Sequence, residues 1–211
     1  MPVISVETLS PGIKLGVWRI AESAEMLLAA YPHLETVVAE YRNHERKIEK
    51  LAVYALLYAM TGTHRLIVAH NADGKPLLAR QAISISDTKG FVAVVTARNR
   101  HTAVAVDIEY VSNRVGKIVR RFVRADEHAP TTSSQLIHWS AKETVYKYYS
   151  PQHLQYSEMR LQPFTVKPED CIKVQNLKQD SELCVHYRLT DEYVLTYAYA
   201  ENASVKKDTE Q

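Results

Sequence analysis

The sequence predicts an α+β fold built from two similar halves, each an antiparallel sheet packed with helices. Short β-prone runs bounded by turn signals recur along the chain, and longer segments with helical spacing lie between them. This order of helices and a strand meander occurs twice, with a junction near His101. We therefore expect one half over residues 1–100, a second over residues 101–205, and a frayed polar tail over residues 206–211.

The first half is expected to begin with a strand over Leu15–Ile20, followed by a short helix over Glu22–Tyr31 that Pro32 stops. Apolar residues then keep helical spacing over Leu34–Met60, which predicts one long helix ended by Gly62.

Three further strands complete the expected first half, namely Arg65–His70, Ala82–Ser86 and Phe91–Ala97. Asn71–Gly74 and Lys89–Gly90 supply the turn signals between them.

The second half is expected to start with an apolar strand over Ala103–Val111. Two helical segments follow, over Arg114–Val123 and Ser133–Tyr149, with candidate N-cap residues at 131–134. A hairpin over Leu183–Leu189 and Tyr193–Ala200 closes it, around a turn at residues 190–192.

Composition excludes several classes of protein. The chain has 211 residues, 46% of them hydrophobic, which is enough for a buried core, and its formal net charge is only +2, which argues against a dedicated nucleic-acid binder. The longest apolar run, Leu51–Met60, is too short to span a bilayer. Cys171 and Cys184 are expected to be inert thiols of a reduced protein. We therefore expect a soluble, cytoplasmic protein.

Two carboxylates share one face of the strand 103–111. Asp107 and Glu109 are two residues apart, so their side chains point the same way, opposite to Val106 and Ile108. Magnesium prefers oxygen ligands, commonly one or two carboxylates together with substrate phosphates. The pattern fits a metal site, but taken alone it is more typical of a strand with one solvated polar face.

Other charged residues offer similar alternatives. Glu143 and Lys147 lie four residues apart on one helical face. They could be a metal ligand and a phosphate contact, or they could form a surface ion pair. Lys75 and Pro76 follow a turn that could approach a nucleotide or be an ordinary surface turn. Glu127 is either a general base or a plain loop carboxylate.

A basic stripe on the long helix is a further candidate. Arg42, Arg46 and Lys50 recur every four residues, with Lys47 beside them, which suits either a phosphate contact or a solvated helix face. Glycine-rich phosphate loops and the zinc-protease and serine-hydrolase motifs are absent from the sequence.

Taken in order, the motifs carry more information than each does alone. Five motifs follow one another in the chain, namely Gly74-Lys-Pro76, Ile83-Ser-Ile-Ser86, Val106-Asp-Ile-Glu109, Arg121-Phe-Val-Arg-Ala-Asp-Glu127, and Trp139-Ser-Ala-Lys-Glu143 with Lys147. This series resembles the 4'-phosphopantetheinyl transferase superfamily, in its larger monomeric branch that activates peptide synthetases and acyl carrier proteins. The resemblance covers about Arg42 to Phe164.

The resemblance implies roles for individual residues. Asp107, Glu109 and Glu143 match the magnesium ligands, and Lys147 matches the lysine that stabilises charge on the phosphates of coenzyme A. Glu127 matches the residue proposed to deprotonate the attacking serine. The segment that lines the adenine corresponds to Lys75 and Pro76, and Ser86 and Asp87 stand in the segment that contacts the phosphates.

Three positions depart from the family pattern. Asp87 replaces a histidine that usually donates to a phosphate, Tyr54 replaces an arginine that serves the 3'-phosphate, and Ala105 replaces a glycine. We expect 3'-phosphate recognition to be weakened or rerouted, with Arg46, Lys47 and Lys89 as substitute contacts.

The resemblance implies magnesium-dependent transfer of 4'-phosphopantetheine from coenzyme A to a serine of an acyl or peptidyl carrier protein. The changed anchors leave a second reading open, a transferase-like protein that is inactive or binds another nucleotide. A non-catalytic partner of carrier proteins is a third, which the retained carboxylates argue against.

Overall fold

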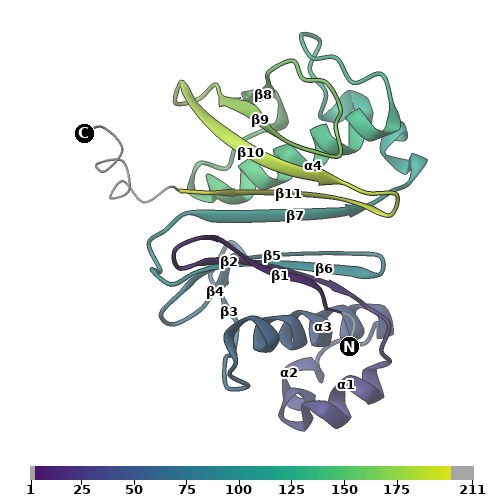
Figure 1. Ribbon diagram of the computed structural model, residues 1–211, viewed down its shortest axis with the longest axis vertical. Helices are drawn as coiled ribbons and strands as arrows, with labels where there is room; N and C mark the ends of the chain where they lie inside the picture. The colour runs from purple at the N-terminus through teal and green to yellow at the C-terminus, as the bar shows by residue number, and fades with distance from the viewer. Residues whose placement is uncertain (1–2, 201–211) are drawn as a thin grey trace.

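The computed structural model describes residues 3–200, so residues 201–205 of the expected second half and the expected tail lie outside it. The fold is mixed α and β, with antiparallel sheets packed with helices, as predicted. Two sheets stack against each other, and each carries helices on its outer side, which gives four layers (Figure 1).

The first sheet has the strand order β1-β2-β6-β5. Its strands are β1 (Val3–Ser10), β2 (Ile13–Arg19), β5 (Ala82–Thr88) and β6 (Phe91–Ala97). Helices α1 (Ala24–Ala30), α2 (Glu35–Val38) and α3 (His44–Thr61) cover its outer face, and β3 (Ala69–His70) and β4 (Pro76–Leu77) form a small separate hairpin.

The second sheet has the order β7-β11-β10-β9-β8 and packs against helix α4 (Thr132–Tyr148). Its strands are β7 (Val104–Tyr110), β8 (Met159–Leu161), β9 (Glu169–Asn176), β10 (Ser181–Leu189) and β11 (Tyr193–Tyr199). The chain passes from one sheet to the other between β6 and β7, close to His101. The division into two halves with their own functional parts stays a prediction.

The expected single helix over residues 34–60 is wrong. The chain forms a 3-10 turn at Pro32–Leu34 and the short α2, and a new helix begins at His44. Asn43 caps α3, because its side-chain oxygen accepts a hydrogen bond of 3.1 Å from the backbone nitrogen of Arg46. Gly62 ends α3 in the left-handed conformation, φ 71°, as predicted.

Other differences concern short or polar elements. Only Ala69–His70 of the expected strand 65–70 is a strand, and the expected helix 114–123 is two 3-10 segments, Asn113–Lys117 and Val119–Arg121. Strands β1, β4, β8 and β9 were not predicted. Strand β4 is only two residues long, β1 and β8 are sheet edges, and the inner face of β9 carries only Ile172 and Val174 as buried apolar side chains.

The expectation of two free thiols is also wrong, because Cys171 and Cys184 are joined in a disulfide with their Cα atoms 5.9 Å apart. They lie on neighbouring antiparallel strands, β9 and β10, a pairing that sequence spacing did not reveal. Among the described residues no helix is both long and apolar enough to cross a membrane.

The sheets meet through apolar side chains. Val106 and Ile108 of β7 pack with Leu15 of β2 and Val95 of β6 in a buried core between the sheets. On the other side of β2, a Cβ at Gly16 would lie 2.7 Å from the sulfur of Met60, so only glycine lets α3 approach this closely.

The edge strands β5 and β7 of the two sheets run side by side, and we call this junction the seam. The backbone nitrogen of Val106 donates to Ser84 Oγ at 3.2 Å, and that of Tyr110 donates to Thr88 Oγ1 at 3.4 Å. The serine and threonine side chains of β5 thus satisfy donors that an edge strand leaves unpaired. The candidate site lies along this seam.

Candidate active site

The two carboxylates of β7 share one face of the strand, as their spacing predicted, and this face meets helix α4. Asp107 and Glu109 reach hydrogen-bond partners on α4, whereas Val106 and Ile108 point into the core between the sheets. An acidic pair is therefore held on a strand whose other face is fixed by apolar packing.

Asp107 is almost fully buried, with 3% of its surface exposed, and both carboxylate oxygens are bonded. Oδ1 accepts from Lys147 Nζ at 2.7 Å and from Ser86 Oγ at 2.9 Å, and Oδ2 accepts from Ser140 Oγ at 2.9 Å. The three donors come from α4 and from β5, so Asp107 ties both edges of the seam together. A buried carboxylate needs such donors to remain ionised.

Lys147 is the cation of the site. Besides Asp107, its ammonium group donates to Ser86 Oγ at 3.1 Å and to the carbonyl oxygen of Val106 at 3.0 Å. About a quarter of its side chain, 26%, remains exposed, so the charge is accessible from the solvent side. It is thus placed to contact an anionic group that enters the seam.

Glu109 lies beside this pair and accepts a hydrogen bond of 2.7 Å from the indole nitrogen of Trp139. Burial, reinforced by the negative charge of Asp107, raises the pKa of Glu109 to about 7. The Trp139 hydrogen bond and Lys147 oppose the shift without cancelling it. Trp139 itself packs against the core of the second half, and it also orients this carboxylate.

Glu143 on α4 accepts a hydrogen bond of 2.6 Å from the hydroxyl of Tyr156. Burial raises the pKa of Glu143, and Asp107 adds to the effect, whereas the Tyr156 hydrogen bond lowers it. Glu143 also raises the pKa of Glu109, so the three carboxylates feel one another's charge.

The donor set fits a hard divalent cation. Three carboxylates that repel one another, in surroundings that raise the pKa of two of them, are stabilised by a cation with oxygen-only ligands such as magnesium. Within residues 3–200, the oxygens of Asp107, Glu109 and Glu143 do not form a group lying entirely within 4.8 Å. Lys147, Trp139 and Tyr156 hold the carboxylates in this more open arrangement.

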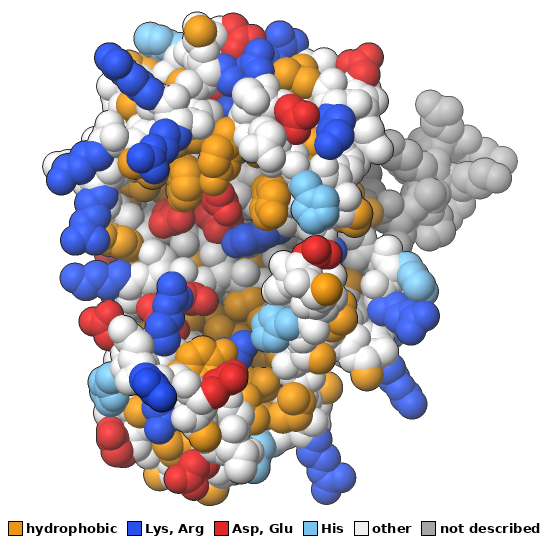
Figure 2. Space-filling view, turned by 180° about the vertical axis from the view of Figure 1, so that it is seen from behind, with side chains coloured by type: hydrophobic (Ala, Val, Ile, Leu, Met, Phe, Trp, Pro, Cys, Tyr) orange, Lys and Arg blue, Asp and Glu red, His pale blue; other side chains and the backbone are white. Residues whose placement is uncertain are grey.

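Two cavities are lined in part by residues of β7. One of about 680 Å³ is lined by Lys75, Pro76, Val104 and Tyr148, next to Lys147 in the chain. The other, of about 270 Å³, is lined by Glu109, Ser112, Arg114 and Trp139 among others. On the rear face of the molecule, acidic side chains lie beside basic ones in a hollow between the upper and lower halves (Figure 2).

Lys75 and Pro76 stand in the first cavity, where the resemblance placed the adenine. The ammonium of Lys75 donates to Ser150 Oγ at 3.0 Å, just after α4 ends, so the β3–β4 hairpin is fastened to the second half. The distance along β7 from Val104 to Asp107 is three residues, about 10 Å in a strand.

Asp87 does not face the acidic cluster. Ser84 and Ser86 point to β7, so Asp87 lies on the opposite face of β5, where Ile83 and Ile85 pack toward α3. There its carboxylate lies 2.8 Å from Arg46, which also pairs with Glu49 at 3.0 Å.

Lys47, a substitute phosphate contact, and Tyr54, which replaces the usual arginine, are placed differently. Lys47 is half-buried on α3, one residue from Arg46. Tyr54 is fully buried in the core beneath the first sheet, and its hydroxyl accepts a hydrogen bond of 3.2 Å from the backbone nitrogen of Val68. Tyr54 therefore fills the core and holds the loop before β3 through this hydrogen bond.

Glu127 is not brought to the acidic cluster. Its side chain and that of Lys142 are both 0% exposed and form an ion pair of 2.7 Å. Its oxygens also accept from the backbone nitrogens of Arg124 at 2.8 Å and Leu161 at 2.7 Å. Sequence reasoning singled out Glu127 as a base; the structure gives it contacts that connect α4, the loop after the 3-10 segment Val119–Arg121, and β8.

Two residues of the site were missed by sequence reasoning. Ser140 lies one helical turn before Glu143, on the face that carries Lys147, so helical spacing could have found it. Tyr156 stands outside any regular strand or long helix, and only the fold brings it to Glu143.

Fold and site together define an α+β protein with an acidic, cation-compatible site at the junction of two sheets. Residues 103–198 match the model of the 4'-phosphopantetheinyl transferase superfamily. This region runs from the start of β7 to the end of β11 and contains Asp107, Glu109, Glu143 and Lys147. Over these residues the chain is similar to that superfamily. No curated protein matches the chain.

Proposed function

We propose that this protein is a magnesium-dependent 4'-phosphopantetheinyl transferase that uses coenzyme A and modifies a serine of an acyl or peptidyl carrier protein. The single observation that carries the proposal is the convergence of Asp107, Glu109 and Glu143 with Lys147 at the seam, inside the region matched by the superfamily model.

Asp107, Glu109 and Glu143 would hold the magnesium ion. Bound there, the ion supplies positive charge to the pyrophosphate and steadies the leaving group. Lys147 gives a second positive charge on the same substrate group, and its hydrogen bonds to Ser86 and Val106 fix its direction. In phosphoryl-type transfers, positioning and charge neutralisation provide most of the rate.

The two cavities suit the two parts of the reaction. The larger one, with Lys75 and Pro76, would take the adenosine end of coenzyme A. The smaller one, beyond Glu109, would admit the carrier serine. The serine hydroxyl gives up its proton to the medium and its oxygen bonds to phosphorus. The bond from phosphorus to the bridging oxygen breaks, and adenosine 3',5'-bisphosphate leaves with that oxygen.

Exposed basic residues lie beside the smaller cavity. Arg114 lines it, Lys117 lies on the same 3-10 segment, and Arg120 and Arg121 lie on the next one, Val119–Arg121. Carrier proteins with acidic helices would be attracted to such a surface. The proposal includes a location in the cytoplasm and no nucleic-acid partner, as the composition suggests, and a monomer, as the resemblance implies.

The test is the intact mass of an apo acyl carrier protein after incubation with this protein, coenzyme A and magnesium. We expect a gain of one phosphopantetheine that is abolished by chelator, by Asp107→Ala and by Lys147→Ala. Asp170→Ala, which removes an exposed carboxylate of β9, is the matched control and should retain activity. No gain with several carriers, from well-folded protein, would contradict the proposal.

One observation favours a second candidate, a transferase-like protein that is inactive or takes another nucleotide. Asp87 holds Arg46, so a cation that could contact a phosphate is already paired with a carboxylate. If no carrier is modified, calorimetric titration with adenosine nucleotides, with and without a 3'-phosphate, identifies the ligand of the larger cavity.

A further inference from the structure

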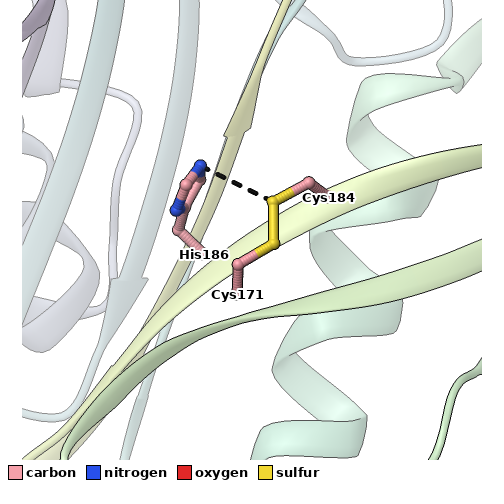
Figure 3. A group of neighbouring side chains, drawn as sticks. All are labelled: Cys171, Cys184 and His186. Carbon is pink, nitrogen blue, oxygen red and sulfur yellow. Dashed lines mark hydrogen bonds between the residues drawn. A yellow bond between two sulfur atoms is a disulfide. The ribbon is translucent and has the colours of Figure 1, made fainter.

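A second group of metal-ligating side chains lies on strands β9 and β10, away from the seam. Cys171, Cys184 and His186 gather on one face of the two strands, and Figure 3 shows the imidazole of His186 turned toward Cys184. His186 Nε2 lies 3.8 Å from Cys184 Sγ, and the ligand atoms of all three residues lie within 4.8 Å of one another.

The strand pairing produces this group. His186 stands directly opposite Cys171, and Cys184 precedes His186 by two residues, so all three point to the same face. The alternate residues Ile172 and Val185 are buried against α4, which fixes that face outward from the helix. The ring of His186 stacks on Tyr197 at 5.1 Å and Tyr199 at 5.8 Å, which restricts its orientation.

We propose that Cys171, Cys184 and His186 form a binding site for a thiophilic divalent cation, with zinc as the representative, once their disulfide is reduced. Two thiolates and an imidazole nitrogen are three of the four ligands of a tetrahedral zinc site. The two thiolates neutralise the charge of the cation, and water takes the fourth position. Soft sulfur ligands select such a cation over magnesium.

The site needs little rearrangement. Zinc lies about 2.0–2.3 Å from its sulfur and nitrogen ligands, so ligand atoms already within 4.8 Å reach bonding distance by side-chain rotation. Cys184 is exposed and Cys171 half-buried, so a reductant and a cation have access from solvent. The thiol form is also the one that a reducing compartment maintains.

The change from disulfide to metal site balances with a thiol reductant. Two reductant thiols give two electrons and two protons to the cystine, the bond between the two sulfurs breaks, and the reductant leaves as its own disulfide. Binding of one cation then releases the two protons from Cys171 and Cys184. The two states exclude each other, because a sulfur in the disulfide has no thiolate pair to offer.

Cobalt titration of the full chain tests the proposal. After reduction under anaerobic conditions, wild-type protein should bind one equivalent of cobalt, with the sulfur-to-cobalt charge-transfer absorption and the visible bands of a tetrahedral site. Zinc in equal amount should displace the cobalt, and excess magnesium should not. The oxidised protein, measured before reduction, should show none of these bands.

Variants assign the ligands. Cys184→Ser should abolish the charge-transfer absorption, and His186→Asn should weaken cobalt binding, whereas His153→Asn, an exposed histidine on a 3-10 turn, should leave it unchanged. Circular dichroism checks folding, and the comparison of oxidised with reduced wild type needs no variant. Equal binding by oxidised and reduced protein, or no tetrahedral spectrum after complete reduction, would overturn the proposal. These readouts do not depend on the proposed transferase activity.

Discussion

The ammonium group of Lys147 lies 2.7 Å from Oδ1 of Asp107, although the two residues are 40 positions apart and belong to α4 and β7. Together with the hydrogen bonds from Ser140 to Asp107 and from Trp139 to Glu109, this ion pair joins the helix to the edge strand. The ammonium group of Lys147 also supplies positive charge to Asp107, which is part of what a bound metal ion would do.

The first prediction concerns the loss of this cation. Lys147→Met leaves the buried carboxylate of Asp107 without its charged partner, so the free energy of unfolding should fall by about 1–3 kcal/mol. Magnesium should recover part of the loss, because it supplies the missing charge. Urea unfolding with and without magnesium measures both effects.

Lys173→Met is the control, since this lysine forms an exposed pair with Glu182 and should change stability by less than about 1 kcal/mol. If Lys147→Met is as stable as Lys173→Met and indifferent to magnesium, the pair does not support the site as described.

The second prediction concerns pH. The pKa of Glu109 is about 7 in the folded protein, above the usual value of 4.5, so the folded state holds the proton more tightly than the unfolded chain. Its contribution to stability is therefore full below about pH 4.5 and is lost as the pH rises to about 7. Glu109→Gln, which cannot ionise, should be more stable than wild type above pH 7, with the gap shrinking toward pH 4.5.

Urea midpoints of both proteins across this pH range give the comparison, with Glu182→Gln as an exposed control on β10. Magnesium should stabilise wild type more at high pH than at low pH, because the ligand form of Glu109 is the ionised one. A wild-type midpoint that rises with pH relative to Glu109→Gln would contradict the assignment.

The third prediction concerns the pair formed by Arg46 and Asp87. Asp87→Asn removes a negative charge 2.8 Å from Arg46 and should strengthen binding of coenzyme A, by a factor on the order of ten at low salt. The 3'-dephospho form should gain less if the freed cation contacts the 3'-phosphate. Calorimetric titration with both compounds measures the difference.

Arg46→Ala should lower affinity for coenzyme A more than for the 3'-dephospho form, and Arg80→Ala serves as a control arginine outside α3. Equal changes for the two ligands would show that Arg46 does not contact the 3'-phosphate.

The fourth prediction separates two roles for Glu127. Glu127→Gln removes the charge that pairs with the fully buried Lys142, and such a loss costs about 3–5 kcal/mol of stability. If Glu127 serves only to hold the structure together, Glu127→Gln should keep the wild-type turnover for each molecule that is folded. The double variant Glu127→Gln with Lys142→Met should recover part of the stability, since no unpaired charge is left.

Urea unfolding and carrier modification under native conditions are both needed here. A variant that unfolds as wild type does, while its turnover collapses, would instead support the expectation from the sequence resemblance that Glu127 takes the serine proton.

The elements that the sequence predicted best are those with strong local signals. The strands around Gly90, helix α4 with its cap at Thr131, and the final hairpin were all expected close to their observed bounds. The break between α2 and α3 was missed because apolar spacing continues across it, although Asn43 is a strong N-cap residue. Of the unpredicted strands, β1 and β8 are sheet edges, and β9 carries few buried apolar side chains.

By itself, the sequence determined that Asp107 and Glu109 share a strand face and that Glu143 and Lys147 share a helix face, because these relationships follow from periods of two and of 3.6 residues. Only the tertiary structure decided that these faces meet, that Ser86 and Ser140 complete the environment of Asp107, and that Glu127 is buried with Lys142. It also decided that Asp87 turns to Arg46 and that Cys171 lies beside Cys184. The physical reason is that local spacing fixes the direction of a side chain, whereas its partner depends on how distant strands and helices pack.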